Sequence, residues 1–229
     1  MTQHHLPEDP SITLTLRRSG RARRMSLRVS HLDGRVTLTL PGHVSDREAL
    51  AFASSKAEWI RGHLAKRRSE ITVAPGVALP IDGQRRTVVS GPGRRPVLTG
   101  DQLVLPAHRA FGPVAQAFLR DLARDRLTAA SDHYARRLGR TFSRITLRDT
   151  RSRWGSCSSK GALMFSWRLI LSPPDVLRYV AAHEVAHLAE MNHSPAFWAV
   201  VTRLYGPWEV QRRWLHDNGS ALHAYRFDP

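Results

Sequence analysis

The chain has 229 residues and a net charge of +16 at neutral pH, with 35 lysines and arginines against 19 aspartates and glutamates. At this length it can bury a substantial core, and its hydrophobic content of 41% is ordinary for a globular protein. It has no run of the ~20 apolar residues that cross a membrane, no signal-peptide core and a single cysteine, so we expect a cytoplasmic protein without a disulfide framework.

The first segment of the chain predicts strands. Residues 1–10 are polar and are expected to form a flexible N-terminus. Residues 11–41 alternate between apolar and polar side chains, as half-buried strands do. Asp33-Gly34 within this segment is typical of a tight turn, so a hairpin is expected there.

One helix and further strands follow. Ser45 and Glu48 have the spacing of a capping box, which opens a helix that extends to about Arg68. Residues 77–106 return to short apolar runs separated by turns that contain glycine. These elements together predict a β-rich subdomain with one helix over residues 11–106.

The next part of the chain combines one long helix with short strands. A helix is expected from about Pro113 to Leu138, with Gly139 ending it. Residues 145–147 and 163–171 are predicted strands. Phe165–Leu171 is the candidate sheet edge that could pair with an extended peptide.

The C-terminal part is predicted to be mainly helical. Ser172 is placed to cap a helix from Pro173 to Met191, and Asn192 is a candidate for the left-handed residue that ends it. Two further helices follow. The order of helix, strands and helices predicts an α+β domain of the zincin type over residues 107–229.

The residues with the clearest chemistry are His183, Glu184, His187 and His193. His183 and His187 are four residues apart, so both imidazoles face the same side of a helix and can reach one metal ion. Zinc with three protein ligands leaves a fourth position for water, and Glu184 is placed to act on that water as a general base. Isolated histidines are more often ordinary surface or core residues, but this spacing favours a hydrolytic zinc centre with one Zn²⁺ per chain.

The third ligand has two candidates. His193 follows six residues after His187, next to Ser194-Pro195, which begins the next predicted helix. Glu209 is the rival, or else an acid that stabilises the N-terminus of its own helix. Glu190 is a candidate for orienting a ligand histidine rather than for binding the metal, or else it is simply an exposed residue.

The stretch from Arg151 to Trp198 resembles the YgjP-like metallopeptidase-type proteins, which are related to the SprT and WLM zinc peptidases. The residues that carry the resemblance are Arg153-Trp154-Gly155-Ser156-Cys157, Trp167-Arg168-Leu169-Ile170, Tyr179-Val180, His183-Glu184, Glu190-Met191-Asn192-His193-Ser194 and Phe197-Trp198. This resemblance implies zinc binding by the three histidines and a general-base role for Glu184. One departure is Ser166, where the family usually has asparagine.

Other polar and aromatic residues near this stretch are candidates for substrate binding. Arg153 could bind a substrate carboxylate or phosphate or stabilise an oxyanion, or could instead form a structural salt bridge. Trp154 and Trp167 are the tryptophans that we expect to line the cleft. Cys157 could be a ligand, a redox switch or a nucleophile, but without a second cysteine a half-buried thiol is favoured.

The leading functional hypothesis is a zinc peptidase that acts on a peptide or protein substrate. A metal-dependent nucleotide phosphohydrolase, a pyrophosphatase, is one alternative, although magnesium sites favour carboxylates over imidazoles. A non-catalytic nucleic-acid-binding protein with a structural zinc is another, but such a zinc would need no general base. The excess of basic residues also favours binding of nucleic acid or another polyanion.

Overall fold

The computed structural model describes residues 2–30, 34–65 and 69–228 as a mixture of helices and small sheets. The chain divides into two compact units, Met1–Ser69 and Glu70–Pro229, each with its own hydrophobic core. The expected boundary after residue 106 is therefore wrong. The strands before it bury Leu79, Val88 and Leu103 in the core of the second unit, which is why they belong to that unit.

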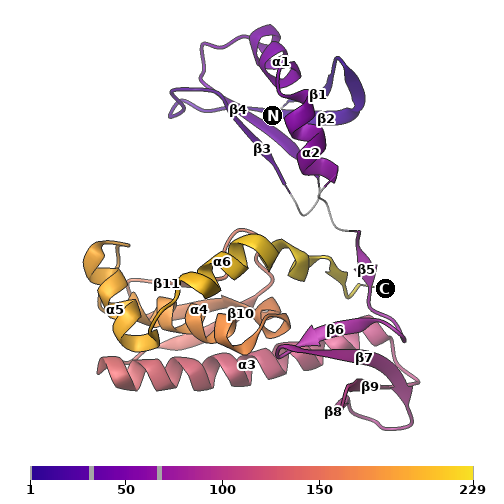
Figure 1. Cartoon of the computed structure of the whole chain (residues 1–229), viewed down its shortest axis with the longest axis vertical. Coiled ribbons are helices and arrows are strands. Elements are labelled where there is room, and N and C mark those ends of the chain that lie inside the picture. The colour runs from indigo at the N-terminus through magenta and orange to yellow at the C-terminus, as the bar shows by residue number, and fades with distance from the viewer. Residues whose placement is uncertain (1, 31–33, 66–68, 229) are drawn as a thin grey trace. The chain divides into compact units, whose positions relative to one another are not determined.

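The first unit is a mixed four-stranded sheet with two helices (Figure 1). The sheet has the order β1-β2-β4-β3, and the elements are β1 (Thr2–Leu6), β2 (Asp9–Arg18), β3 (Ser26–Val29), β4 (Val36–Leu40), α1 (Asp46–Ser54) and α2 (Ala57–Ala65). β1 pairs antiparallel with β2, so Thr2 lies opposite Leu16. The expected flexible N-terminus is therefore wrong, because backbone pairing orders a segment that its polar side chains do not mark as a strand.

Two further expectations concern this unit. β3 and β4 pair antiparallel as the predicted hairpin, with Val29 opposite Val36, whereas Asp33 lies outside the described residues. The single predicted helix is divided into α1 and α2. Ser55 ends α1 and donates a hydrogen bond to the carbonyl of Phe52, which draws the chain away from a continuous helix. The expected end of that helix at Arg68 also lies outside the described residues.

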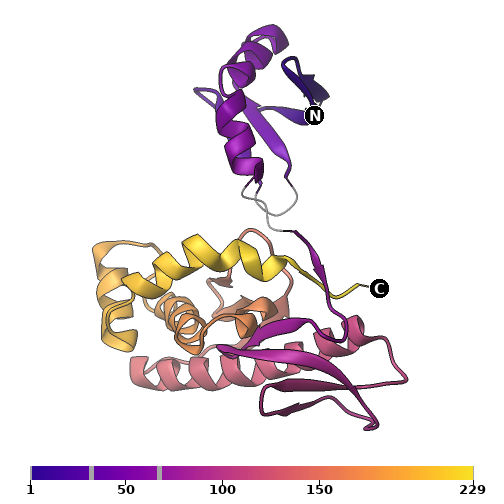
Figure 2. The ribbon, with the colours of Figure 1, turned by 45° about the vertical axis from the view of Figure 1, so that its right-hand side comes forward.

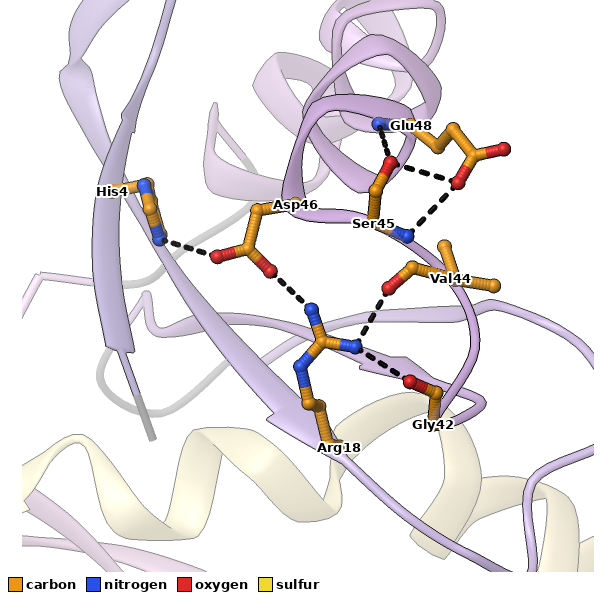
Figure 3. Close-up of polar contacts among 7 residues, drawn as sticks. All are labelled: His4, Arg18, Gly42, Val44, Ser45, Asp46 and Glu48. Atoms are coloured by element: carbon orange, nitrogen blue, oxygen red, sulfur yellow. Dashed lines mark hydrogen bonds and ion pairs between the residues drawn. The ribbon is translucent and has the colours of Figure 1, made fainter.

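The N-terminus of α1 is joined to the sheet by polar contacts (Figure 3). Ser45 caps the helix as predicted, because its hydroxyl accepts from the backbone of Glu48 while the Glu48 carboxylate accepts from the Ser45 backbone. From β2, the guanidinium of Arg18 donates to the carboxylate of Asp46 at 2.6 Å and to the carbonyl of Val44 at 2.6 Å. These contacts fix the end of β2 to the start of α1.

The second unit begins with strands β5 (Ile71–Thr72), β6 (Ala78–Ile81), β7 (Gln84–Gly91), β8 (Val97–Thr99) and β9 (Gln102–Pro106). β6 to β9 form a sheet in the order β6-β7-β9-β8. Asp82 and Gly83 connect β6 to β7 with positive φ values of 51° and 78°, the conformation of a tight hairpin turn. β5 pairs instead with the C-terminal strand β13 (Tyr225–Arg226).

Helices make up most of the rest of this unit, and Figures 1 and 2 show the long α3 running along it with the other α-helices on one side. They are α3 (Phe111–Leu138), α4 (Pro174–Ala186), α5 (Pro195–Tyr205), α6 (Glu209–Asn218) and the short η2 (Gly219–His223). α3 ends as predicted, with Gly139 in the left-handed conformation at φ 70°. No helix within the described residues is long and apolar enough to cross a membrane.

A three-stranded sheet lies in the chain between α3 and α4. It has the order β10-β12-β11, followed by a 3-10 helix, and the elements are β10 (Arg144–Arg148), β11 (Gly155–Cys157), β12 (Ala162–Ser166) and η1 (Trp167–Leu171). The expected edge at Phe165–Leu171 is wrong, because β12 is the central strand and the rest of that segment is the buried η1. A short apolar run does not distinguish a strand from a buried helical turn. The edge strands are β10 and β11.

A buried arginine joins this sheet region to the C-terminal segment. The guanidinium of Arg168 donates to both carboxylate oxygens of Asp149, at 2.7 and 3.0 Å. It also donates to the carbonyls of Leu222 and Tyr225, at 2.9 and 3.0 Å. This charge is paired and hydrogen-bonded, so it can be buried without a large penalty, and it anchors the end of the chain.

Candidate metal centre

α4 carries the first part of the site at its C-terminal end. The helix begins at Pro174 with Pro173 as its N-cap, and the Ser172 hydroxyl donates to the carbonyl of Leu169 instead of capping it as predicted. It ends at Ala186, so His187 is its C-cap residue. The predicted end at Met191 is wrong, because tight backbone turns replace the helical hydrogen bonds after Ala186.

The early end of α4 turns the chain back towards the site. Asn192 does not adopt the left-handed conformation that was expected to end the helix. Ser194 caps α5 as predicted, accepting a hydrogen bond from the backbone of Phe197 at 3.4 Å. His193, directly before this cap, returns to the two histidines of α4. Nε2 of His193 lies 3.0 Å from Nε2 of His183.

The three histidines converge on one point. Each of His183, His187 and His193 offers a ring nitrogen, and these three atoms lie within 4.8 Å of one another. Nδ1 of His187 lies 3.0 Å from the backbone carbonyl of Glu190, so this nitrogen carries the proton and Nε2 keeps its lone pair for a ligand. The orienting group at residue 190 is thus a carbonyl rather than the side chain.

A buried phenylalanine supports all three rings. Phe197 is fully buried, and its ring centroid lies 4.4 Å from that of His187, 4.8 Å from that of His193 and 4.9 Å from that of His183. Because the rings pack on one rigid side chain, their mutual positions are restricted before any ligand binds. Phe197 is the positioning residue of this cluster.

The environment favours the neutral form of the two imidazoles on α4. Burial, together with the neighbouring His187 and His193, lowers the pKa of His183 to about 3. Burial also lowers the pKa of His187, although its hydrogen bond to the carbonyl of Glu190 opposes this. A neutral imidazole is the form that binds metal, so protons do not compete strongly for these nitrogens near neutral pH.

Glu184 faces the same region as a buried acid. It is 5% exposed, and burial raises its pKa to about 8 against the opposing charge of Arg153. β11 lies so close that a Cβ placed on Gly155 would be 2.5 Å from Oε1 of Glu184. Only glycine leaves room for the carboxyl group at that position.

Two buried polar atoms of the site have no hydrogen-bond partner in the described part of the chain. Nδ1 of His183 and Oε2 of Glu184 are inaccessible and have no hydrogen-bond partner among the described residues. Unsatisfied buried polar atoms are uncommon, and several at one place mark a site for an ion, water or substrate. The three converging imidazoles and the unpaired carboxyl oxygen of Glu184 fit a divalent metal ion next to an acid.

The other candidate ligands have different roles. The Glu209 carboxylate accepts from the backbone of Trp208 at the start of α6, at 3.0 Å, as expected of an acid in the first turn of a helix. Cys157 is half-buried, and burial and the nearby Glu184 raise the pKa of its thiol. That shift disfavours the thiolate, the form that binds metals and attacks substrates.

The three predicted substrate-binding residues lie in different environments. Trp167 is 1% exposed and packs edge-to-face on Phe227, so it belongs to the core and has no surface for a substrate. Trp154 is half-buried, with its ring 5.3 Å from that of His223. Arg153 is exposed, forms no side-chain ion pair among the described residues, and acts electrostatically on Glu184.

Sequence reasoning did not identify several residues of the site. In the sequence, Gly155 and Phe197 stand out only as parts of the motifs shared with the family. Each is recognisable only from its spatial neighbours, because a glycine or a phenylalanine has no spacing that indicates a role.

A known protein family matches most of this chain. A family model described as YgjP-like, metallopeptidase domain, matches residues 23–218 and so includes the whole metal cluster. Among curated proteins none matches the chain. Among solved structures, the crystal structure of the metallopeptidase zymogen of Pyrococcus abyssi abylysin aligns with 40% of this chain and 93% of its own, at 19% identity and a TM-score of 0.36.

Proposed function

Since the chain belongs to the YgjP-like metallopeptidase family, we propose that it is a zinc-dependent peptidase with a zincin-type active site on α4. The observation that carries the proposal is the buried carboxyl of Glu184, whose Oε2 has no partner, next to three ring nitrogens within 4.8 Å of one another. A purely structural metal site closes its coordination with protein ligands and needs no such acid.

His183, His187 and His193 would hold one zinc ion. Imidazole ligands suit zinc better than magnesium or calcium, which prefer oxygen. Bound there, zinc would lower the pKa of a water molecule and polarise the scissile carbonyl. The same ligand preference supports peptide hydrolysis over the magnesium-dependent hydrolysis of nucleotides.

Glu184 would move the proton in this reaction. Its carboxylate accepts the proton of the attacking water, and the resulting carboxylic acid donates it to the nitrogen of the leaving amine. Burial disfavours the ionised carboxylate in the metal-free protein, whereas a nearby cation favours it. The unpaired Oε2 is then free to act as the base.

The substrate would add to the sheet at β11. This strand is an edge, and Gly155 places it directly against Glu184. An extended peptide that pairs with an edge strand gains backbone hydrogen bonds irrespective of its side chains. Arg153, two residues before β11, would bind a carbonyl or carboxylate of that peptide.

The test uses Glu184→Gln, His193→Ala and Glu209→Ala beside the wild type. We expect one zinc per wild-type chain, retained in Glu184→Gln and Glu209→Ala and lost in His193→Ala. Hydrolysis of unfolded casein should fall at least ~100-fold in Glu184→Gln, since general acid–base catalysis contributes 10²–10⁴-fold. Zinc content is measured by elemental analysis of the same samples.

The outcomes separate the candidate functions. Full casein hydrolysis by Glu184→Gln would contradict the assigned base. Turnover of nucleoside triphosphates but not of casein would favour the phosphohydrolase. A folded wild type without stoichiometric metal would rule out a hydrolytic zinc centre.

A further inference from the structure

Arg212 is an exposed cation without an acidic partner. It lies on α6, which packs against α4 (Figures 1 and 2). Among the described residues its side chain forms neither a hydrogen bond nor an ion pair. The nearest acid in the sequence, Glu209, is engaged by the backbone at the helix N-terminus. Arg212 is therefore available to bind an anion.

Two indole rings hold this guanidinium in place. Trp198 and Trp208 stack with their centroids 4.2 Å apart and their planes at 24°. Cζ of Arg212 lies 5.2 Å from the centroid of Trp198 and 5.6 Å from that of Trp208. Trp208 is itself fixed, because its indole N–H donates to the hydroxyl of Thr202 at 3.1 Å. Such stacking restricts the arginine side chain while leaving its N–H groups exposed.

This arrangement lies beside the metal cluster. The ring centroid of Trp198 is 5.6 Å from that of His183 and 5.9 Å from that of His193. The Arg212 guanidinium is thus no more than about 11 Å from the His183 ring. Its charge is also among the causes that lower the pKa of His183. Because an extended chain advances about 3.3–3.6 Å per residue, that reach corresponds to roughly three residues of a bound peptide.

We propose that Arg212, held by Trp198 and Trp208, is a substrate-binding residue that selects peptides with a carboxylate within about three residues of the scissile bond. The inference rests on the peptidase function proposed above. A guanidinium donates two parallel hydrogen bonds to a carboxylate, and its pre-ordered geometry lowers the entropy cost of that pairing. An amide in the same position would gain neither the charge nor the paired acceptors.

The test measures binding, so that it does not depend on turnover. Zinc-loaded Glu184→Gln protein is titrated with three hexapeptides of otherwise equal sequence. One has an internal aspartate and an amidated C-terminus, the second replaces this aspartate by asparagine, and the third keeps the asparagine but has a free C-terminal carboxylate. Affinities are measured by tryptophan fluorescence and calorimetry. Arg212→Gln and, as the matched control, Arg213→Gln are made in the same background.

We expect one of the carboxylate peptides to bind roughly ten- to a hundredfold more tightly than the amide peptide. Arg212→Gln should remove this preference, whereas Arg213→Gln should keep it, because Arg213 is exposed and has no aromatic contact within the described part of the chain. A preference for the aspartate peptide identifies an acidic side chain as the ligand, and one for the third peptide identifies the chain terminus.

Equal affinity for all three peptides, or a preference that survives Arg212→Gln, would overturn the inference. Tighter binding of inorganic triphosphate than of any peptide would also overturn it. Casein hydrolysis by the wild type reports on the proposed peptidase separately. Hydrolysis without carboxylate selection therefore rejects the role of Arg212 alone.

Discussion

Gly155 and Phe197 shape the metal cluster although neither has a polar side chain. Gly155 lets β11 approach so closely that any Cβ would collide with the carboxyl of Glu184. Phe197 contacts all three candidate ligand rings from within the core. At the residue scale, the position of the Glu184 carboxyl depends on the room that Gly155 leaves, and the positions of the three histidine rings depend on Phe197.

Gly155→Ala should separate the base from the metal. The added methyl group would displace the Glu184 carboxyl, because its Cβ would lie 2.5 to 2.7 Å from the carboxyl atoms. We expect zinc content to be unchanged and kcat to fall by about 10²-fold, the lower range for loss of a general base. Gly62→Ala, where nothing lies within 4 Å, is the control. Normal kcat in Gly155→Ala would show that the carboxyl position is not critical.

At the scale of elements, the site is built where one helix ends and the next begins. α4 stops at Ala186, and the turns that follow let His193 return to His183. α5 begins directly after His193 and Ser194; Ser194 caps it, and Pro195 is in its first turn. A helix that continued to Met191, as the sequence indicated, would carry the chain away from His183 and His187 by about 1.5 Å per residue.

Ser194→Ala should therefore weaken both the helix and the metal site. Loss of an N-cap costs about 1 kcal/mol. Because His193 directly precedes the cap, we also expect weaker zinc affinity, measured by chelator competition. Ser45→Ala removes the cap of α1 in the first unit and should lower stability by a similar amount while leaving zinc affinity unchanged. Equal zinc affinities in both variants would contradict the coupling.

At the scale of the whole molecule, stability is tied to neutral histidines as well as to apolar burial. His223, where the C-terminal segment packs, has its pKa lowered to about 4 by burial and by the charge of Arg168, with Asp149 opposing. Its folded pKa is below the unfolded value of 6.5, so protons favour the unfolded chain. The stability that His223 contributes is present above pH 6.5 and is lost as the pH falls towards 4.

His223→Phe should remove part of this pH dependence while keeping a ring next to Trp154. Between pH 7 and pH 5 the wild type should lose about 1–2 kcal/mol more stability than the variant, after allowance for partial exposure. Denaturant unfolding of both proteins at the two pH values measures the difference. An equal loss of stability between pH 7 and pH 5 in the wild type and in His223→Phe would contradict this prediction.

The net charge of +16 is a property of the whole molecule. Binding of a polyanion remains a prediction from this charge. Binding of the full chain to mixed-sequence nucleic acid should weaken steeply as salt rises, because each phosphate contact releases counterions. Fluorescence anisotropy over a salt series measures this. Absent or salt-independent binding would contradict the prediction.

Comparison of sequence and structure shows where local patterns suffice. The capping box of α1, the N-cap of α5, the end of α3 at Gly139 and the hairpin between β3 and β4 were predictable, because each depends on a few neighbouring residues. The strand β1, the break between α1 and α2 and the 3-10 helix after β12 were not. β1 depends on backbone pairing with β2, the break on the turn at Ser55, and the 3-10 helix on burial, and the spacing of apolar residues records none of these.

The sequence by itself determined that His183, Glu184 and His187 lie together. Helical periodicity places His183 and His187 on one face with Glu184 beside them, because four residues complete about one turn. Only the tertiary structure decided which strand edge adjoins Glu184, which aromatic ring supports the histidines and which arginine lies beside them. Those contacts join residues far apart in the chain, and burial and packing, which no local spacing records, bring them together.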